Sequence, residues 1–235
     1  METVRFDRLA ARSGQISRRE VRGLLRMGRL TADGAVPASP EQKVREDAVV
    51  CLDGVPLNCA AARCFLLHKP AGVLSATEDR DQPTVLDLLP VELRRLGLFP
   101  AGRLDKDTTG LLLLTNDGPL AHRVVSPKHR VPKVYLAEVD GVLDGRDAAA
   151  FASGIVLGDG SACLPALLEL AGSSLGRVTV YEGKYHQVKR MFAALGKPVR
   201  SLHRERVGGL DLSGCPAPGD WRELDASELS SLFCP

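Results

Sequence analysis

The hydrophobic and polar positions of the first sixty residues predict two short helices followed by a small sheet. Within residues 4–13 apolar side chains recur at helical spacing, and Gly14 supplies a stop. Aspartate–glycine pairs at 33–34 and 53–54 stand between short apolar runs, which is typical of two-residue hairpin turns. Residues 1–58 are therefore expected to form a compact unit.

The second of these helices is predicted to carry arginines on its outer face. It begins with a capping box over residues 17–20, in which a serine and a glutamate satisfy exposed backbone amides of the first turn. A buried stripe follows at Val21, Leu24, Leu25 and Gly28. The rest of the surface carries Arg19, Arg22, Arg26 and Arg29. Because such a face lacks the acidic partners that would neutralise it, it favours phosphate binding over a merely solvated surface.

The remainder of the chain is predicted to consist mainly of strands joined by turns. Apolar or alternating runs indicate strands at 65–69, 111–115, 133–139 and 177–181. A helix is expected over residues 186–195, where Val188, Met191, Phe192 and Leu195 form one stripe. Because strands and helices do not alternate, we expect an α+β fold with a mainly antiparallel mixed sheet flanked by helices.

Length and composition are those of an ordinary globular protein. The chain has 235 residues, of which 44% are hydrophobic and 26% charged, and its longest apolar run, at 111–114, is far too short for a membrane span. The first ten residues include arginine and aspartate and lack an apolar signal core, so we expect a cytoplasmic protein that is neither secreted nor bound to a membrane. The six cysteines show neither a C-x-x-C pair nor zinc-site spacing and are expected to be free thiols.

The net charge of +2 conceals two basic segments. Residues 1–30 contain eight arginines and three acids (+5), and residues 184–206 contain seven basic residues and one acid (+6), so the rest of the chain carries 2 − 11 = −9. This distribution indicates a surface for a polyanion, built from parts that are distant in sequence.

A polar loop in front of a buried strand is the first candidate for chemistry. Residues 102–118 read GRLDKDTTGLLLLTNDG, a loop with two aspartates, a buried strand and a turn at 116–118. We expect Asp105 and Asp107 to point to opposite sides, which leaves no room between them for the sugar of a glycosidase. One would then act while the other caps or orients the loop. The spacing alone is equally compatible with an aspartate-rich turn that only caps an element.

Two further side chains have alternative interpretations. Tyr135 is expected opposite Val134 and Leu136, away from the apolar side, where it could stack on a base or simply span the edge of the core. Lys189 lies next to Val188 on the flank of the helical stripe, where its long side chain could reach a cleft or remain at the surface.

Four motifs together resemble the RsuA-type pseudouridine synthases: GRLD-x-x-T-x-G-LLLLTNDG, K-x-Y, EGKYHQVKRMFAALG and HRERVGGL, which begin at residues 102, 133, 182 and 203. In front of them, residues 4–58 resemble the S4 RNA-binding domain. The resemblance covers essentially the whole chain. It implies an S4-like domain at 1–58 and a catalytic domain at 64–235. Residues 59–63 show no clear periodicity and are the candidate linker.

The resemblance also implies roles for individual residues. Asp105 matches the aspartate that breaks the C1′–N1 bond of the target uridine, Lys189 the basic residue that compensates its charge, and Tyr135 the tyrosine that stacks on the flipped base. Asp107 and Thr108 would shape the loop. RNA or substrate contacts are assigned to Arg103, Arg19, Arg22, Arg26, Arg29 and Arg190. Neither a metal nor an organic cofactor is implied, because the rearrangement transfers no group and changes no oxidation state.

The implied partner is ribosomal RNA. Residues 185–191 and 203–209 look like those of small-subunit enzymes, so we expect a monomer that modifies a 16S rRNA uridine, within an assembling small subunit, and whose RNA affinity falls as salt is added. Two alternatives remain open. One is an enzyme for 23S rRNA, and the other is a non-catalytic S4-type RNA-binding factor for ribosome assembly.

Overall fold

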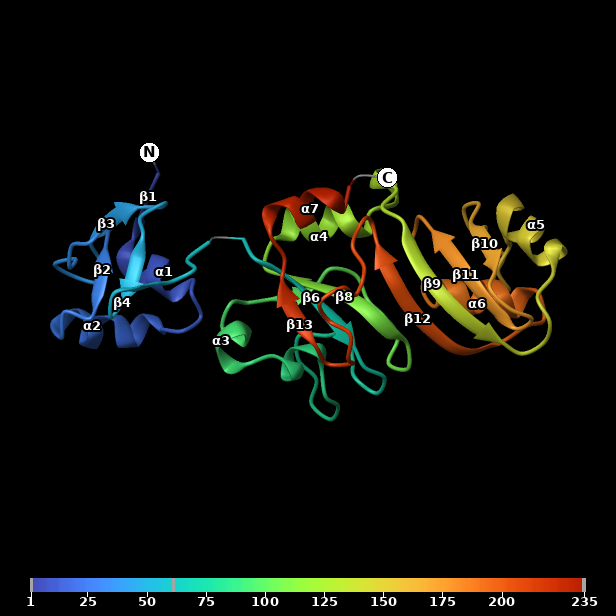
Figure 1. Cartoon of the computed structure of the whole chain (residues 1–235), viewed down its shortest axis with the longest axis horizontal. Helices are drawn as coiled ribbons and strands as arrows, with labels where there is room; N and C mark the ends of the chain where they lie inside the picture. The colour runs from blue at the N-terminus through green and yellow to red at the C-terminus, as the bar shows by residue number, and fades with distance from the viewer. Residues whose placement is uncertain (1, 61, 234–235) are drawn as a thin grey trace. The chain divides into compact units, whose positions relative to one another are not determined.

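The computed structural model describes residues 2–60 and 62–233, which group into two compact units (Figure 1). The first comprises Met1–Arg63 and Leu89–Leu98, and the second Cys64–Leu88 and Phe99–Pro235. The segment Leu89–Leu98 thus contacts the first unit, although the sequence assigned it to the catalytic domain. The predicted domain limits stay a prediction, and Ala61, within the predicted linker, lies outside the described residues. Among the described helices, none is long and apolar enough to cross a membrane.

The described residues of the first unit form three helices and two small sheets, and one hydrophobic core joins the first two helices to the strands. Its helices are α1 (Phe6–Ala11), α2 (Arg18–Arg26) and α3 (Val91–Arg94). Its strands are β1 (Thr3–Arg5), β2 (Leu30–Ala32), β3 (Lys43–Arg45), β4 (Val50–Leu52) and β5 (Val55–Pro56), paired as β1–β3 and β2–β4–β5. The predicted capping box is confirmed, because the backbone N–H of Glu20 donates to Ser17 Oγ and that of Ser17 donates to Glu20 Oε2.

Three predicted details of this unit are different in the structure. The first helix is shorter, because residues 3–5 pair with β3 as strand β1. The buried stripe of α2 ends at Leu25, and Gly28 is exposed. The turn at 33–34 has positive φ at both residues, but β2 pairs chiefly with β4, so the expected hairpin is reduced to one bridge between Ala32 and Ala35.

The second unit is built on an eight-stranded sheet. Its strand order is β10-β11-β9-β12-β8-β6-β13, with β7 beside β8, and among these pairings only β12–β8 is parallel. The strands are β6 (Cys64–Lys69), β7 (Phe99–Pro100), β8 (Thr109–Thr115), β9 (Lys133–Val139), β10 (Leu167–Leu170), β11 (Leu175–Val180), β12 (Val199–Val207) and β13 (Trp221–Glu223). The predicted α+β fold with a mainly antiparallel mixed sheet is confirmed.

Helices cover this sheet in two places (Figure 1). They are α4 (Gly118–Val125) and α7 (Ala226–Ser231), which pack with β6 and β8, and α5 (Gly145–Ser153) and α6 (Gln187–Ala194), which pack with β9 and β11. Short 3-10 helices stand at Val85–Leu88 and Pro127–His129. The predicted stripe of α6 is confirmed, with Val188, Met191 and Phe192 buried. The turn expected at 116–118 is instead the start of α4, where Asp117 is the N-cap.

Candidate active site

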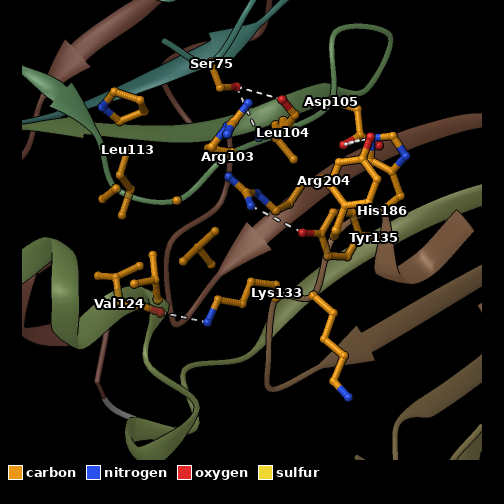
Figure 2. A pocket seen from close by; sticks show the side chains of 18 of the residues that line it. Ser75, Arg103, Leu104, Asp105, Leu113, Val124, Lys133, Tyr135, His186 and Arg204 are labelled. Atoms are coloured by element: carbon orange, nitrogen blue, oxygen red, sulfur yellow. Dashed lines mark hydrogen bonds and ion pairs between the residues drawn. The ribbon is translucent and has the colours of Figure 1, made fainter. Parts of the chain in front are cut away.

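A cleft of about 670 Å³ lies on the second unit, between the loop before β8, the strands β9 and β12, and the start of α6 (Figure 2). Three residues singled out from the sequence line it: Arg103, Asp105 and Tyr135. Its size is in the range of pockets that hold small molecules or single nucleotides. The structure therefore gathers side chains from distant parts of the sequence around one cavity.

The backbone of the loop in front of β8 is held by buried polar contacts. The Ser75 hydroxyl donates to Leu104 O at 2.8 Å and accepts from the Leu104 N–H at 3.1 Å. The fully buried Lys69 ammonium donates to the carbonyl oxygens of Pro70, Lys106 and Thr108 at 2.9, 3.2 and 2.9 Å. Burial lowers the pKa of Lys69 to about 8, although the nearby aspartates oppose that shift. The loop is thus tied to β6 by a cation that water does not reach.

Asp105 is held through both of its carboxylate oxygens. Lys189 Nζ lies 3.0 Å from Oδ2, and His186 Nε2 lies 3.3 Å from Oδ1. Figure 2 shows the His186 ring beside this carboxylate at the rim of the cleft. Two partners on separate oxygens fix the orientation of the side chain, and the ammonium compensates its charge. The proximity of Lys189 and Asp105, which the sequence-based hypothesis requires, is present.

Lys189 also binds the second aspartate of the loop, with Nζ 2.6 Å from Asp107 Oδ1. Burial lowers the pKa of Lys189, but hydrogen bonds to Asp107 and Asp105 outweigh it and raise the pKa overall. The same contact holds the pKa of Asp107 below its usual value. The expectation that the two aspartates diverge is wrong, because the Thr108 N–H donates to Asp105 O and closes a turn. Residues two apart also share a face in extended chain.

His186 is a part of the site that the sequence analysis missed. It is the N-cap of α6 and has left-handed backbone angles, φ 48° and ψ 35°, which are uncommon for a residue other than glycine. Its side chain makes no capping bond and contacts Asp105 instead. The available signal was spacing, since His186 and Lys189 are three residues apart at the start of a helix and share a face.

Tyr135 and Arg204 form a second contact in the cleft. Arg204 Nη1 donates to Tyr135 Oη at 3.3 Å, and Arg204 Nε donates to Leu111 O at 2.7 Å (Figure 2). No pattern in the sequence assigned a role to Arg204. The expectation that Tyr135 lies away from the apolar side is wrong, because Ala137 and Val139 on its face of β9 are the buried ones. The tyrosine lies at the edge of the core.

Lys133 is a further buried cation of the cleft. Its Nζ donates to Val124 O at 2.7 Å, and only 6% of the residue is exposed. Burial, and to a lesser degree the charge of Arg204, lower its pKa to about 8. Lys133, the first residue of the K-x-Y motif, therefore brings an ammonium with one protein acceptor into the same cleft as Tyr135.

The arginines predicted to contact RNA are in different situations. Arg103 lines the cleft, whereas Arg190 pairs with Asp159 and donates to Tyr185 O. The expectation of an arginine face without acidic partners is wrong for two residues, because loops supply Glu41 to Arg22 on α2 and Asp53 to Arg29, which follows the end of α2. Within residues 2–60 and 62–233, Arg19 and Arg26 make no ion pair.

The five described cysteines are free thiols, as predicted, and Cys234 lies outside the described residues. In the described part of the chain, no group of three or more His, Cys, Asp or Glu side chains is placed to hold a metal ion.

Comparison with known proteins agrees with this geometry. The model of the RNA pseudouridylate synthase family matches residues 63–194, more than half of the chain. An uncharacterized RNA pseudouridine synthase of Bacillus subtilis is 42% identical over 97% of this chain and 98% of its own length. A ribosomal small subunit pseudouridine synthase A of Pseudomonas aeruginosa is 44% identical over 97% of this chain and 100% of its own. A solved structure described as a pseudouridylate synthase superposes with a TM-score of 0.69 at 35% identity, covering 97% and 99% of the two chains. The chain belongs to the RNA pseudouridylate synthase family.

Proposed function

We propose that this protein converts a uridine of small-subunit ribosomal RNA to pseudouridine, with Asp105 as the nucleophile. The observation that carries the proposal is the carboxylate of Asp105, held by Lys189 and His186 at the rim of a cleft that also contains Tyr135. The choice of RNA rests on relatives such as the Pseudomonas aeruginosa protein, whose name specifies the small subunit.

The reaction moves the sugar from one atom of the uracil ring to another. The carboxylate of Asp105 assists cleavage of the C1′–N1 bond, the freed uracil rotates, and C5 then bonds to C1′. The hydrogen on C5 leaves to solvent and N1 ends with a proton, so atoms and electrons balance without an added reagent. Such chemistry requires a nucleotide extruded from its stack into the cleft.

The other residues of the cleft supply charge and placement. Lys189 places a positive charge 3.0 Å from Asp105 and holds its carboxylate in position. Tyr135, whose hydroxyl accepts from Arg204, presents its ring to the extruded base. Arg103 in the same cleft is placed to contact a phosphate of that nucleotide.

The first unit is proposed to be an S4-like domain that binds rRNA. Arg19 and Arg26 on α2 are exposed, and neither forms an ion pair with another described residue, so both can bind phosphates. We further propose that the protein acts as a monomer in the cytoplasm, on RNA of an assembling small subunit.

The test uses 16S and 23S rRNA transcripts labelled with tritium at uridine C5, because formation of pseudouridine releases that label to water. The wild type is expected to release tritium from 16S RNA, and Asp105→Asn to release none while it still binds the RNA. The Asn variant retains the size of the side chain, removes its charge and replaces one acceptor oxygen by an NH2 donor.

Three results would contradict the proposal. Release from 23S RNA alone would reject the small subunit as the source of the substrate. Release by Asp105→Asn at the wild-type rate would reject the nucleophile. No release from naked RNA or from assembling subunits, together with salt-sensitive binding, would identify a non-catalytic RNA-binding factor.

A further inference from the structure

Tyr185 differs from every other aromatic residue of the chain in its exposure. The sequence contains six Phe, three Tyr and one Trp, all within the described residues, and Tyr185 alone is exposed, at 75%. A large ring in water loses the free energy that burial would supply. An isolated exposed ring is common on protein surfaces, so exposure alone assigns no function.

The position of Tyr185 beside the reacting carboxylate is the second observation. Its ring stacks on that of His186, with centroids 3.8 Å apart and planes inclined by 20°. His186 in turn contacts Asp105 through Nε2 at 3.3 Å. The left-handed backbone of His186 is a locally unfavourable conformation, which the surrounding fold maintains and which directs the ring toward Asp105. One continuous path of contacts therefore leads from an exposed aromatic face to the proposed nucleophile.

We propose that the exposed face of Tyr185 stacks on an unpaired base of the RNA adjacent to the target uridine, and that this stacking braces His186 against Asp105. The inference rests on the proposed function, because it assumes an RNA substrate in this cleft. It adds a second base-binding position, distinct from the one at Tyr135.

The surroundings of Tyr185 favour a nucleobase over an apolar protein partner. The cleft that it lines also contains Lys184 and Arg103, and Arg190 donates to the Tyr185 carbonyl. Arg103, which forms no ion pair with another described residue, can pair with the phosphate of a nucleotide whose base stacks on Tyr185. An apolar protein surface would instead leave these charges poorly solvated.

The experiment compares Tyr185→Phe with Tyr185→Leu in single-turnover tritium release from the 16S transcript, with enzyme in excess. Phenylalanine keeps the stacking ring, whereas leucine keeps apolar volume without it. For Tyr185→Leu we expect the half-saturating enzyme concentration to rise about tenfold, the size typical of one lost base–aromatic stack, and the maximal rate to fall. Tyr185→Phe should stay within about twofold of the wild type on the same scale.

The outcomes separate this inference from the function on which it rests. If the wild type releases no tritium, the proposed function fails. If the wild type is active and Tyr185→Leu matches Tyr185→Phe, the stacking position is rejected. Unchanged thermal midpoints would show that both variants are folded, as expected for an exposed side chain.

The bracing of His186 has its own test, a double-mutant cycle with His186→Ala. If Tyr185 acts on Asp105 through His186, the loss of maximal rate in the double variant will be smaller than the product of the single losses. If the loss of maximal rate in the double variant equals the product of the two single losses, Tyr185 does not act through His186.

Discussion

The two basic segments of the chain, alike in charge, use their cations in different ways. In residues 184–206, six of the seven basic side chains have a fixed partner inside the protein: Lys184, Lys189, Arg190, Lys197, Arg200 and Arg204. In residues 1–30, Arg5, Arg12, Arg18, Arg22 and Arg29 also pair with carboxylates, but Arg19 and Arg26 on α2 are exposed and form no ion pair with another described residue. The segment at 184–206 is therefore not the free phosphate-binding surface that its charge predicted.

This contrast separates two uses of positive charge. A cation with a short contact inside a cleft fixes the geometry of its partner and is little affected by salt. An exposed cation attracts a polyanion from solution, and its contribution falls as salt is added. We therefore expect substitutions in 184–206 to change the rate of the reaction, and substitutions on α2 to change RNA affinity.

The largest effect is expected for Lys189→Met, which would leave Asp105 and Asp107 close together without their shared cation. We predict that kcat falls at least about 100-fold, since one preorganised charge contact typically contributes that much. Tritium release under saturating RNA measures it.

Asp107→Asn is the matched control for this prediction. It removes the other carboxylate bound to Lys189 but leaves the Lys189–Asp105 contact in place, so it should lower kcat by much less. If the two variants lost activity equally, Lys189 would act through the shape of the loop and not through the charge of Asp105.

The next largest effect is expected on stability, from the buried cation Lys69. Lys69→Met leaves three backbone carbonyl groups without their donor, and we expect the free energy of unfolding to fall by about 3 kcal/mol. Lys133→Met removes a buried ammonium with one protein acceptor and should cost about 1 kcal/mol or less. Urea unfolding measures both losses. Equal losses would show that stability does not depend on how many carbonyl groups each lysine binds.

These two lysines also predict a pH dependence of stability. Burial lowers both pKa values from 10.5 to about 8, so between pH 8 and 10.5 the folded protein releases protons that the unfolded chain still binds. The free energy of unfolding should therefore rise with pH in this window, by at most about 1.4 kcal/mol per pH unit for each lysine. Lys133→Met should lose part of the rise, and an unchanged slope in urea titrations from pH 7 to 9.5 would contradict the shifted pKa.

The parts of the site that could be predicted from the sequence are those that lie in short motifs or at regular helical spacing. Asp105, Lys189 and Tyr135 belong to motifs, and helical periodicity placed Lys189 on the flank of α6. His186 stands three residues before Lys189, but that spacing does not encode the left-handed backbone that directs its ring to Asp105, and the role of Arg204 depends on the approach of β12 to β9. The partners of Arg22 and Arg29 come from loops 19 and 24 residues away in sequence, beyond any helical spacing rule.

A smaller effect, on affinity alone, is expected for the double variant Arg19→Gln/Arg26→Gln. If each arginine binds one phosphate, the slope of log affinity against log salt should decrease by about 1.4 to 1.8, while kcat stays near the wild-type value. Filter binding at several salt concentrations measures the slope. Arg22→Gln/Arg29→Gln is the control, because both arginines already have acidic partners, and an equal change there would show that paired and unpaired arginines bind RNA alike.

The smallest effect is expected at Thr108, a polar group of the catalytic unit whose hydroxyl has no hydrogen-bond partner among the described residues. Its side chain is buried, with 1% of the residue exposed, so the hydroxyl loses its hydration without compensation. Thr108→Val keeps the shape and the backbone N–H that closes the turn at Asp105, and should raise the free energy of unfolding by about 1 kcal/mol or less. A loss of stability instead would show that ordered water binds this hydroxyl. A gain of stability together with a loss of tritium release would show that the polar hydroxyl of Thr108, although costly to the fold, is needed in the loop that carries Asp105.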